Sequence, residues 1–203
     1  DASEELAIKR GVFTTFTGSK FDVPGGRRLR HSSCTTIAPT GTISLIAGCN
    51  VGIEPFYAMV FVRNVLDGEN LLEINPYFET TARRDGFFSG ELLRKMVSCI
   101  DLNRIEGIPD DAKRVFVTAN RIKPEWHVKM QAAFQRHTDG AVSKMTNVPF
   151  ETTKEEEAEI FMLGYHQDLK GITLYRDSSR ELQALCADDK AISMVSDYVA
   201  AHP

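Results

Sequence analysis

Short apolar runs rich in β-branched residues alternate along this chain with longer segments whose apolar residues recur every three or four positions. The short runs predict strands and the longer segments predict helices. Gly and Pro residues stand between most of these segments and predict turns. We predict strands over residues 35–38, 56–65, 71–74, 141–148 and 171–175, and helices over 3–10, 43–47, 76–84, 91–100 and 124–137. A helical, exposed tail is predicted over residues 181–203.

The clearest pattern covers residues 141–175. Thr153 and Glu156 have the spacing of a capping box, in which a hydroxyl and a carboxylate satisfy N–H groups at the start of a helix. The helix that they open carries an apolar stripe formed by Ala158, Phe161, Met162 and Tyr165. Strand, helix and strand over about 35 residues predict a βαβ unit with parallel strands and a right-handed crossover.

The helix predicted over residues 124–137 begins at Pro124, a residue favoured at the first helical position. Its apolar positions predict one packed face, made of Trp126, Met130, Ala133, Phe134 and His137. Because His127 and His137 lie nearly three turns apart, one helix cannot offer both to the same metal ion. We therefore predict structural histidines and no metal site.

Two further strands, over residues 56–65 and 71–74, flank an Asp67-Gly68 pair and predict a hairpin. The 203 residues are 42% hydrophobic and 26% charged, which excludes collagen-like, mucin-like and wholly disordered chains. A net charge of -4 does not suggest a nucleic-acid surface. Apolar runs fall far short of the roughly 20 residues that span a bilayer, so no membrane partner is expected.

The start of the chain and its cysteines indicate where the protein works. Residues 1–5 are acidic and lack the basic and apolar parts of a signal peptide. The four cysteines include no CxxC pair, which favours a reduced, cytoplasmic protein over a disulfide framework or zinc ribbon. Because no initiator Met is present, we expect the chain to be a piece of a longer protein.

Candidate chemistry centres on residues 35–44, where a strand leads through a tight turn into a helix with a hydroxyl-rich first turn. The first N–H groups of a helix have no internal partner and lie at the positive end of its dipole. A phosphate bound there would collect several N–H bonds, and Gly41 would allow it close to the backbone. The segment lacks a P-loop Lys and is not GxGxxG. It fits either a phosphate site or an ordinary N-capped helix.

Other candidates each have two interpretations. Arg27, Arg28 and Arg30 form either a solvated basic loop or an anion site. Cys34 and Cys49 flank the turn, from which both could approach a bound phosphate, and they are either small, buried apolar residues or redox groups.

Glu54 and Tyr175 are equally open. Glu54 either orients its loop or pairs with an Arg, and no acid–base partner is identifiable. Tyr175 ends the last strand of the βαβ unit, where it either fills the core or touches a ligand.

Several long motifs carry a family resemblance. Together they resemble the large catalytic chain of ribonucleotide reductases, and the Thr-Gly-Thr turn is similar to the class II, adenosylcobalamin-dependent branch. The motifs are Thr36-Ile37-Ala38-Pro39-Thr40-Gly41-Thr42-Ile43-Ser44, Gly52-Ile53-Glu54-Pro55, Trp126-His127-x-x-Met130-Gln131-Ala132-Ala133-Phe134-Gln135, His137-Thr138-Asp139-x-Ala141-Val142-Ser143-Lys144, and Lys170-Gly171-Ile172-Thr173-x-Tyr175-Arg176-Asp177-x-Ser179-Arg180. In the metal-radical branch, two adjacent tyrosines that relay the radical would fall on Tyr175 and Arg176. The Arg therefore favours class II.

The resemblance implies an α/β fold that is the C-terminal portion of a ten-stranded α/β barrel of the ribonucleotide reductase type, with a β-hairpin and peripheral helices. It implies that residues 1–185 belong to the barrel domain and that residues 186–203 form a C-terminal helical tail. Cys186 stands alone where the family carries a pair. Because part of a barrel exposes apolar strand edges, we expect self-association or rescue by the missing part.

The same resemblance implies the chemistry. In the full enzyme a thiyl radical abstracts the 3′-hydrogen of a ribonucleotide, the 2′-hydroxyl leaves, and two thiols supply electrons. The radical Cys, the reducing Cys pair and the Asn and Glu that handle protons have no match here, so no catalytic residue is expected. The resemblance places substrate phosphates at Pro39, Thr40, Gly41, Thr42 and Ile43, with Ser44 assisting.

The implied partners are a ribonucleoside di- or triphosphate, the N-terminal remainder of the reductase chain and, in the full enzyme, adenosylcobalamin and a second copy. Two alternatives stay open. One is a non-catalytic nucleotide-binding or assembly module, either a split-gene half or a decayed relative. The other is a fragment of a metal-radical, class I reductase.

Overall fold

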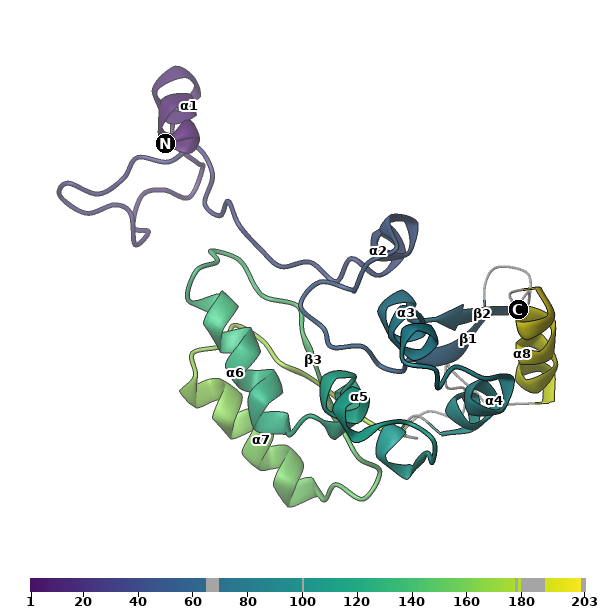
Figure 1. Cartoon of the computed structure of the whole chain (residues 1–203). Helices are drawn as coiled ribbons and strands as arrows, with labels where there is room; N and C mark the ends of the chain where they lie inside the picture. Colours follow the sequence, from purple (N-terminus) through teal and green to yellow (C-terminus); the bar gives the residue numbers. More distant parts are fainter. Residues whose placement is uncertain (65–69, 100, 178, 180–188, 202–203) are drawn as a thin grey trace.

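The computed structural model describes residues 1–64, 70–99, 101–177, 179 and 189–201. Apart from α1 and the loop after it, which lie at one end, the elements gather in two groups (Figure 1). In chain order they are α1 (Ala2–Arg10), α2 (Gly41–Ala47), β1 (Val60–Asn64), β2 (Asn70–Ile74), α3 (Pro76–Arg84), α4 (Gly90–Ser98), η2 (Leu102–Arg104), α5 (Asp110–Val115), η3 (Ala119–Arg121), α6 (Pro124–Gln135), β3 (Met145–Val148), α7 (Lys154–His166), β4 (Thr173–Arg176) and α8 (Asp189–Ala201).

The first group, the hairpin group, is built on β1 and β2, which pair antiparallel from Val60 opposite Ile74 to Asn64 opposite Asn70. This confirms the predicted hairpin, although its turn, with Asp67 and Gly68, lies outside the described residues. Helices α4 and α8 pack against the hairpin. The shared core includes Met59, Val60, Val62, Phe78, Ala82, Leu92, Leu93, Met96, Val97 and Val195.

Helix α8 corrects the prediction of an exposed tail. Val195 is fully buried, and Met194, Tyr198 and Val199 pack against the same core. The apolar positions of α8 therefore cover α4 and β2, and they do not face solvent. The predicted boundary between residues 185 and 186 lies outside the described residues, as does Cys186.

The second group, the parallel group, contains the predicted βαβ unit. β3 and β4 pair parallel from Met145 opposite Thr173 to Val148 opposite Arg176, with α7 between them in the chain. The capping box is present, because the Thr153 hydroxyl accepts from the Glu156 N–H and the Glu156 carboxylate accepts from the Thr153 N–H. The pattern over residues 141–175 thus predicts the unit correctly, although β3 is shorter than expected.

The predicted strand over residues 35–38 forms one parallel bridge, between Ile37 and Val142. Its two hydrogen bonds run from the Ile37 N–H to the Ala141 carbonyl at 3.4 Å and from the Ser143 N–H to the Ile37 carbonyl at 2.8 Å. A parallel ladder continues two residues on, where Pro39 has no N–H to donate. The predicted strand is therefore reduced to one bridge, and Pro39 ends the pairing on its C-terminal side, as the prediction has it.

The packed faces predicted for α6 and α7 are wrong. Trp126, Met130 and Phe134 are exposed, and α6 buries His127, Val128, Gln131, Ala132 and Gln135 instead. On α7, the four residues of the predicted stripe are exposed, and the helix buries Ile160 and Gly164. Both helices turn an apolar stripe outward.

The mixed helix and strand content agrees with the α/β prediction. Among the described residues the strands form one antiparallel and one parallel two-stranded sheet, and these close no barrel. None of the helices described here has the length and apolar composition needed to span a bilayer.

Candidate functional site

The predicted phosphate-binding residues lie in a turn between the bridge at Ile37 and helix α2. Thr40 has a positive φ of 52°, rare for a residue with a side chain, and it reverses the chain so that α2 begins at Gly41. The helix begins two residues earlier than predicted and ends at Ala47 as predicted, and the following Gly48 has a φ of 61°. The exposed Thr42 and Ile43 lie in its first turn. The structure therefore brings all five predicted residues together at one helix start.

Ser44 has a different place from the one expected. Its residue is buried, its N–H donates to the Thr40 carbonyl at 3.0 Å, and its hydroxyl donates to the Gly41 carbonyl at 2.8 Å. The Ser44 hydroxyl thus holds the first turn of α2 together. The N–H groups of Gly41, Thr42 and Ile43 have no helical carbonyl four residues before them, so they are the donors that the turn offers.

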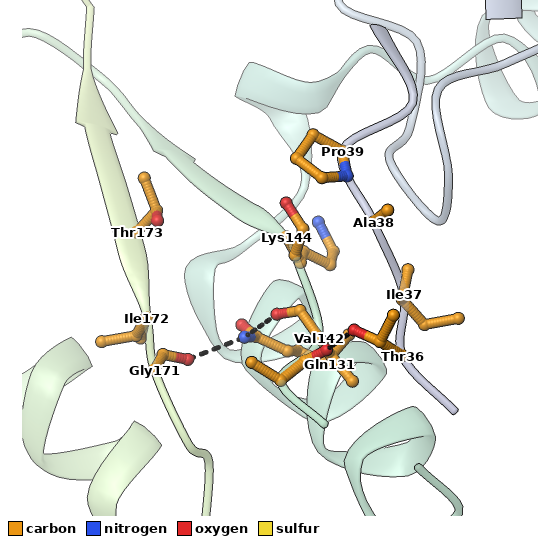
Figure 2. A pocket seen from close by; sticks show the side chains of 12 residues that line it. Thr36, Ile37, Ala38, Pro39, Gln131, Val142, Lys144, Gly171, Ile172 and Thr173 are labelled. Carbon is orange, nitrogen blue, oxygen red and sulfur yellow. Dashed lines mark hydrogen bonds between the residues drawn. The ribbon is translucent and has the colours of Figure 1, made fainter. Parts of the chain in front are cut away.

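A cavity of about 470 Å³ adjoins the turn. It is lined by three stretches of parallel chain, residues 36–39, 141–144 and 171–173, and by Gln131 of α6. In Figure 2, Gln131 lies beneath the strands and Pro39 stands at the opposite end, so the cavity runs toward the predicted turn.

Gln131 ties two of these stretches together. Its Nε2 donates to the Val142 carbonyl at 2.9 Å and to the Gly171 carbonyl at 2.8 Å (Figure 2). The residue is 1% exposed, and its buried Oε1 has no hydrogen-bond partner among the described residues. A buried amide from a helix thus satisfies backbone carbonyls at the point where the strands begin.

Behind the turn lies a buried charged network. The Lys144 ammonium donates to Glu54 Oε2 at 3.1 Å, to His127 Nδ1 at 2.8 Å and to the Met145 carbonyl at 3.0 Å. The Glu54 Oε1 accepts from the Met145 N–H at 2.6 Å. Glu54 therefore orients its own segment, one of its two predicted roles, and its partner is a Lys rather than an Arg.

The partners of His127 fix its protonation. Its Nε2 lies 3.1 Å from the Ala119 carbonyl, which can only accept, so Nε2 carries the proton and Nδ1 accepts from Lys144. Burial and the neighbouring Lys144 charge lower the pKa of His127 to about 4. Burial also lowers the pKa of Lys144, and Glu54 opposes that shift. His127 is thus a neutral structural histidine, as predicted.

Comparison with known proteins places these features in a family. The family model described as "Ribonucleotide reductase, barrel domain" matches residues 26–175. The chain belongs to this family. The turn, the cavity and the Lys144 network of this reductase barrel-domain chain all lie within the matched residues.

Two relatives are much longer than this barrel-domain chain. The vitamin B12-dependent ribonucleoside-diphosphate reductase of Thermoplasma acidophilum is 47% identical over 186 residues, which make up 92% of this chain and 24% of that protein. The reductase of the same name from Mycobacterium tuberculosis (strain ATCC 25618 / H37Rv) is 44% identical over 184 residues, 91% of this chain and 26% of that protein. The chain spans about a quarter of the length of these relatives.

A solved structure shares the fold. The alpha subunit of the class Id ribonucleotide reductase of Actinobacillus ureae superposes with a TM-score of 0.64 at 24% identity, covering 87% of this chain and 31% of that chain.

The end of β4 carries Tyr175 and Arg176. Tyr175 is half-buried, so the structure puts it neither fully in the core nor on the surface. The Arg176 guanidinium lies 3.8 Å from Glu157 and over the ring of Phe150, 5.7 Å from its centre. Arg176 is therefore held by its own group of strands and helices.

The remaining candidates lie away from a common centre. Cys34 and Cys49 are exposed, so neither is the buried apolar residue of one interpretation, and Cys99 is half-buried. His137 follows α6 and is exposed. Within the described part of the chain, no three His, Cys, Asp or Glu side chains are grouped in a way that could hold a metal ion.

The basic cluster is occupied by the N-terminal segment. Arg27 pairs with Asp1 and Glu4 at 3.3 and 2.8 Å, and Arg28 lies over the Phe16 ring. Arg30 donates to two backbone carbonyls. The exposed Arg27 and Arg28 confirm the predicted solvated basic loop, and the contacts of its arginines also anchor the first 30 residues to one another.

Sequence reasoning quotes Gln131 and Lys144 within its motifs but assigns no role to them or to Gln135. His127, Gln131 and Gln135 recur every four positions on α6, which is the spacing of a single helix face. An amphipathic helix ordinarily turns its polar face to solvent, so this spacing by itself predicts exposed side chains, and only the fold shows that they are buried.

Proposed function

We propose that this barrel-domain segment binds the phosphates of a ribonucleoside diphosphate for a reductase that uses adenosylcobalamin to produce deoxyribonucleotides. The observation that carries the proposal is the turn at residues 39–43, which presents the free N–H groups at the start of α2 beside a cavity. Both relatives above carry "ribonucleoside-diphosphate reductase" in their names, which favours a diphosphate over a triphosphate.

The segment's own contribution is binding and orientation. A phosphate at Gly41, Thr42 and Ile43 accepts N–H bonds, and the Thr42 hydroxyl adds a donor. Because α2 has only seven residues, the N–H groups contribute more than the helix dipole. Holding the phosphates, which are remote from the reacting ribose, orients the sugar and lowers the barrier to its reduction. We assign no catalytic residue within this chain.

The described residues do not by themselves fit adenosylcobalamin. The cavity of about 470 Å³ suits a small ligand and is too small for a corrin, and none of its lining residues is a His. The cofactor therefore belongs to the complete reductase, and we assign none of its contacts to this chain. The names of the relatives and the Arg at position 176 favour this branch over the metal-radical branch.

The proposed partner is the rest of a reductase chain, with which this segment completes a ten-stranded barrel in the cytoplasm. The outward apolar stripes of α6 and α7 support this, because large exposed apolar patches mark interaction surfaces. A homodimer of the complete enzyme is part of the same proposal.

The test is a charge placed at the helix start in the complete reductase. Thr42→Asp puts a carboxylate among the N–H groups, where it favours the helix but repels phosphate. We expect KM for a ribonucleoside diphosphate, measured with adenosylcobalamin and a dithiol, to rise about tenfold or more, which corresponds to about 1.4 kcal/mol.

The matched control is Thr42→Asn, which has the same shape without the charge. It should leave KM within about threefold of the unmodified enzyme. Equal KM values for the two variants would place the phosphates elsewhere. Absence of any reductase activity in the complete protein would leave a nucleotide-binding module.

A further inference from the structure

The strand that leads to the turn separates from its neighbour at Pro39. After the bonds of the Ile37–Val142 bridge, the next pair in a parallel ladder would join the residue 39 N–H to the Ser143 carbonyl and the Met145 N–H to the residue 39 carbonyl. The first of these hydrogen bonds cannot form, because Pro39 has no N–H. The second is replaced by another, because the Met145 N–H donates to Glu54 Oε1 at 2.6 Å and not to the Pro39 carbonyl.

We infer that Glu54 is a positioning residue for the phosphate-binding turn: its carboxylate takes the ladder position that the chain leaves at Pro39, and it fixes the segment that supports Thr40 and Gly41. This inference rests on the proposed function of residues 39–43. Glu54 does not itself form part of the helix start, so it acts through the backbone of the turn.

The segment that carries Glu54 is a closed turn. The Glu54 N–H donates to the Val51 carbonyl at 2.9 Å, and the Asn50 amide donates to the Glu54 carbonyl. The Asn50 Oδ1 also accepts from the Val51 N–H at 3.0 Å. Because these bonds close residues 50–54 on themselves, docking the Glu54 side chain docks the whole turn.

Gly52 brings this closed turn against the candidate site. It has a φ of 49°, and a Cβ placed on it would lie 3.4 Å from the Ala38 carbonyl and 3.7 Å from the Thr40 hydroxyl. A side chain at position 52 would therefore touch the residue whose positive φ starts α2, and glycine leaves that narrow space between the two turns. A shift of residues 50–54 would remove the support beneath Thr40.

Lys144 makes the docking of a carboxylate possible. Its side chain is 2% exposed and the Glu54 side chain 22%, so an unpaired charge on either would lie largely out of water. The three ammonium protons have three acceptors, on Glu54, His127 and the Met145 carbonyl. The neutral His127 adds no charge, so the pair is balanced.

The experiment uses the complete reductase and Glu54→Gln. The amide retains an oxygen for the Met145 N–H but presents a donor group to the Lys144 ammonium. We expect KM for a ribonucleoside diphosphate to rise roughly tenfold and kcat to fall less than about threefold, because binding energy common to ground and transition states is lost. Competitive inhibition by inorganic pyrophosphate, which carries no nucleoside, should weaken in parallel.

Two further variants separate positioning from general damage. Lys144→Met combined with Glu54→Gln removes the donor clash, so KM should return at least partly toward the unmodified value. Tyr198→Phe removes the hydrogen bond from the Tyr198 hydroxyl to Glu79 in the hairpin group, at 2.9 Å, and should leave KM unchanged.

The outcomes divide cleanly. A raised KM with retained kcat, together with partial rescue in the double variant, supports the inference. An unchanged KM in Glu54→Gln, or an equal rise in Tyr198→Phe, overturns it. If Thr42→Asp also leaves KM and pyrophosphate inhibition unchanged, the proposed function fails as well, whereas an effect of Thr42→Asp alone removes only the role of Glu54.

Discussion

The hairpin group and the parallel group of this molecule are held together in different ways. The hairpin group has a continuous apolar core to which β1, β2, α3, α4 and α8 all contribute. In the parallel group the buried apolar cluster is small, formed by Val128, Val148 and Ile160. Polar side chains from α6 reach the backbone of the strands instead. The candidate site thus belongs to the region held by hydrogen bonds.

Three residues of α6 show how that second region is built. His127 contacts the Ala119 carbonyl, Gln131 donates to the Val142 and Gly171 carbonyls, and Gln135 donates to the Gly140 carbonyl at 2.9 Å. Each side chain therefore hydrogen-bonds backbone carbonyls that lie in a short turn or just before a strand, outside the α-helices and the strands themselves. Hydrogen bonds depend on direction, whereas apolar packing depends mainly on area, so this region fixes backbone positions more tightly.

The largest effect should come from breaking the apolar region. Phe78 is fully buried, with the rings of Phe87 and Phe116 edge-on at 6.0 and 5.3 Å. We expect Phe78→Ala to lower the free energy of unfolding by about 3–5 kcal/mol in urea denaturation. The neighbouring Tyr77 is 70% exposed, and Tyr77→Ala should change the free energy of unfolding by less than about 0.5 kcal/mol. Similar losses for both variants would contradict the apolar core.

A smaller effect should appear in the polar region on acidification. The folded pKa of His127 is about 4, below the 6.5 of an unperturbed His, because of burial and the Lys144 charge. Between pH 4 and pH 6.5 the unfolded chain binds more protons at His127 than the folded chain does. The neutral His127 therefore contributes its full stabilisation above pH 6.5, and this stabilisation is lost as the pH falls toward 4. The loss is about 3 kcal/mol at most.

The measurement compares the unfolding free energy of the chain with that of His127→Gln from pH 7 to pH 4. Gln can contact the Ala119 carbonyl and accept from Lys144 without titrating. The difference between the two proteins should shrink as pH falls. Parallel curves would show that His127 is not the titrating group.

Much of the fold can be predicted from local sequence signals. The capping box at Thr153 and Glu156 and the Pro76 start of α3 act within a few residues, so the pattern predicts them correctly. The parallel group is harder, because its buried positions are polar and their partners lie far away in the chain. Apolar periodicity then selects the outward face of α6.

The candidate site divides in the same way. The turn at residues 39–43 follows from its Pro, Thr and Gly residues and the helix after it. The contacts that support the turn cannot be predicted from local residues, because Glu54 and Lys144, which form an ion pair, are 90 positions apart in the sequence. The end of the strand before Pro39 is also predicted correctly, since the missing N–H of Pro is a local property.

The smallest effect should come from the outward stripe of α6. Trp126 is 57% exposed, and its described ring contact is with the Lys129 ammonium, 4.3 Å from the ring centre. We expect Trp126→Gln to lower the unfolding free energy of this chain by less than about 1 kcal/mol. In the complete reductase we expect a larger loss, measured the same way, because we propose that the remaining chain covers this face. Equal losses of unfolding free energy in the chain and in the complete reductase would show that the stripe is uncovered in both proteins.

The bridge between Ile37 and Val142 has a consequence for how the protein is made. The Cys34 N–H donates to Asp139 across 105 positions, whereas β1 and β2 are neighbours in the chain. Distant contacts close large loops and form slowly. On the ribosome, residues 39–43 emerge long before residues 139–145 exist. We therefore expect the turn at residues 39–43 to remain without its supporting contacts until Lys144 and Met145 are synthesised. The candidate site then forms late in folding, although its own residues are synthesised early.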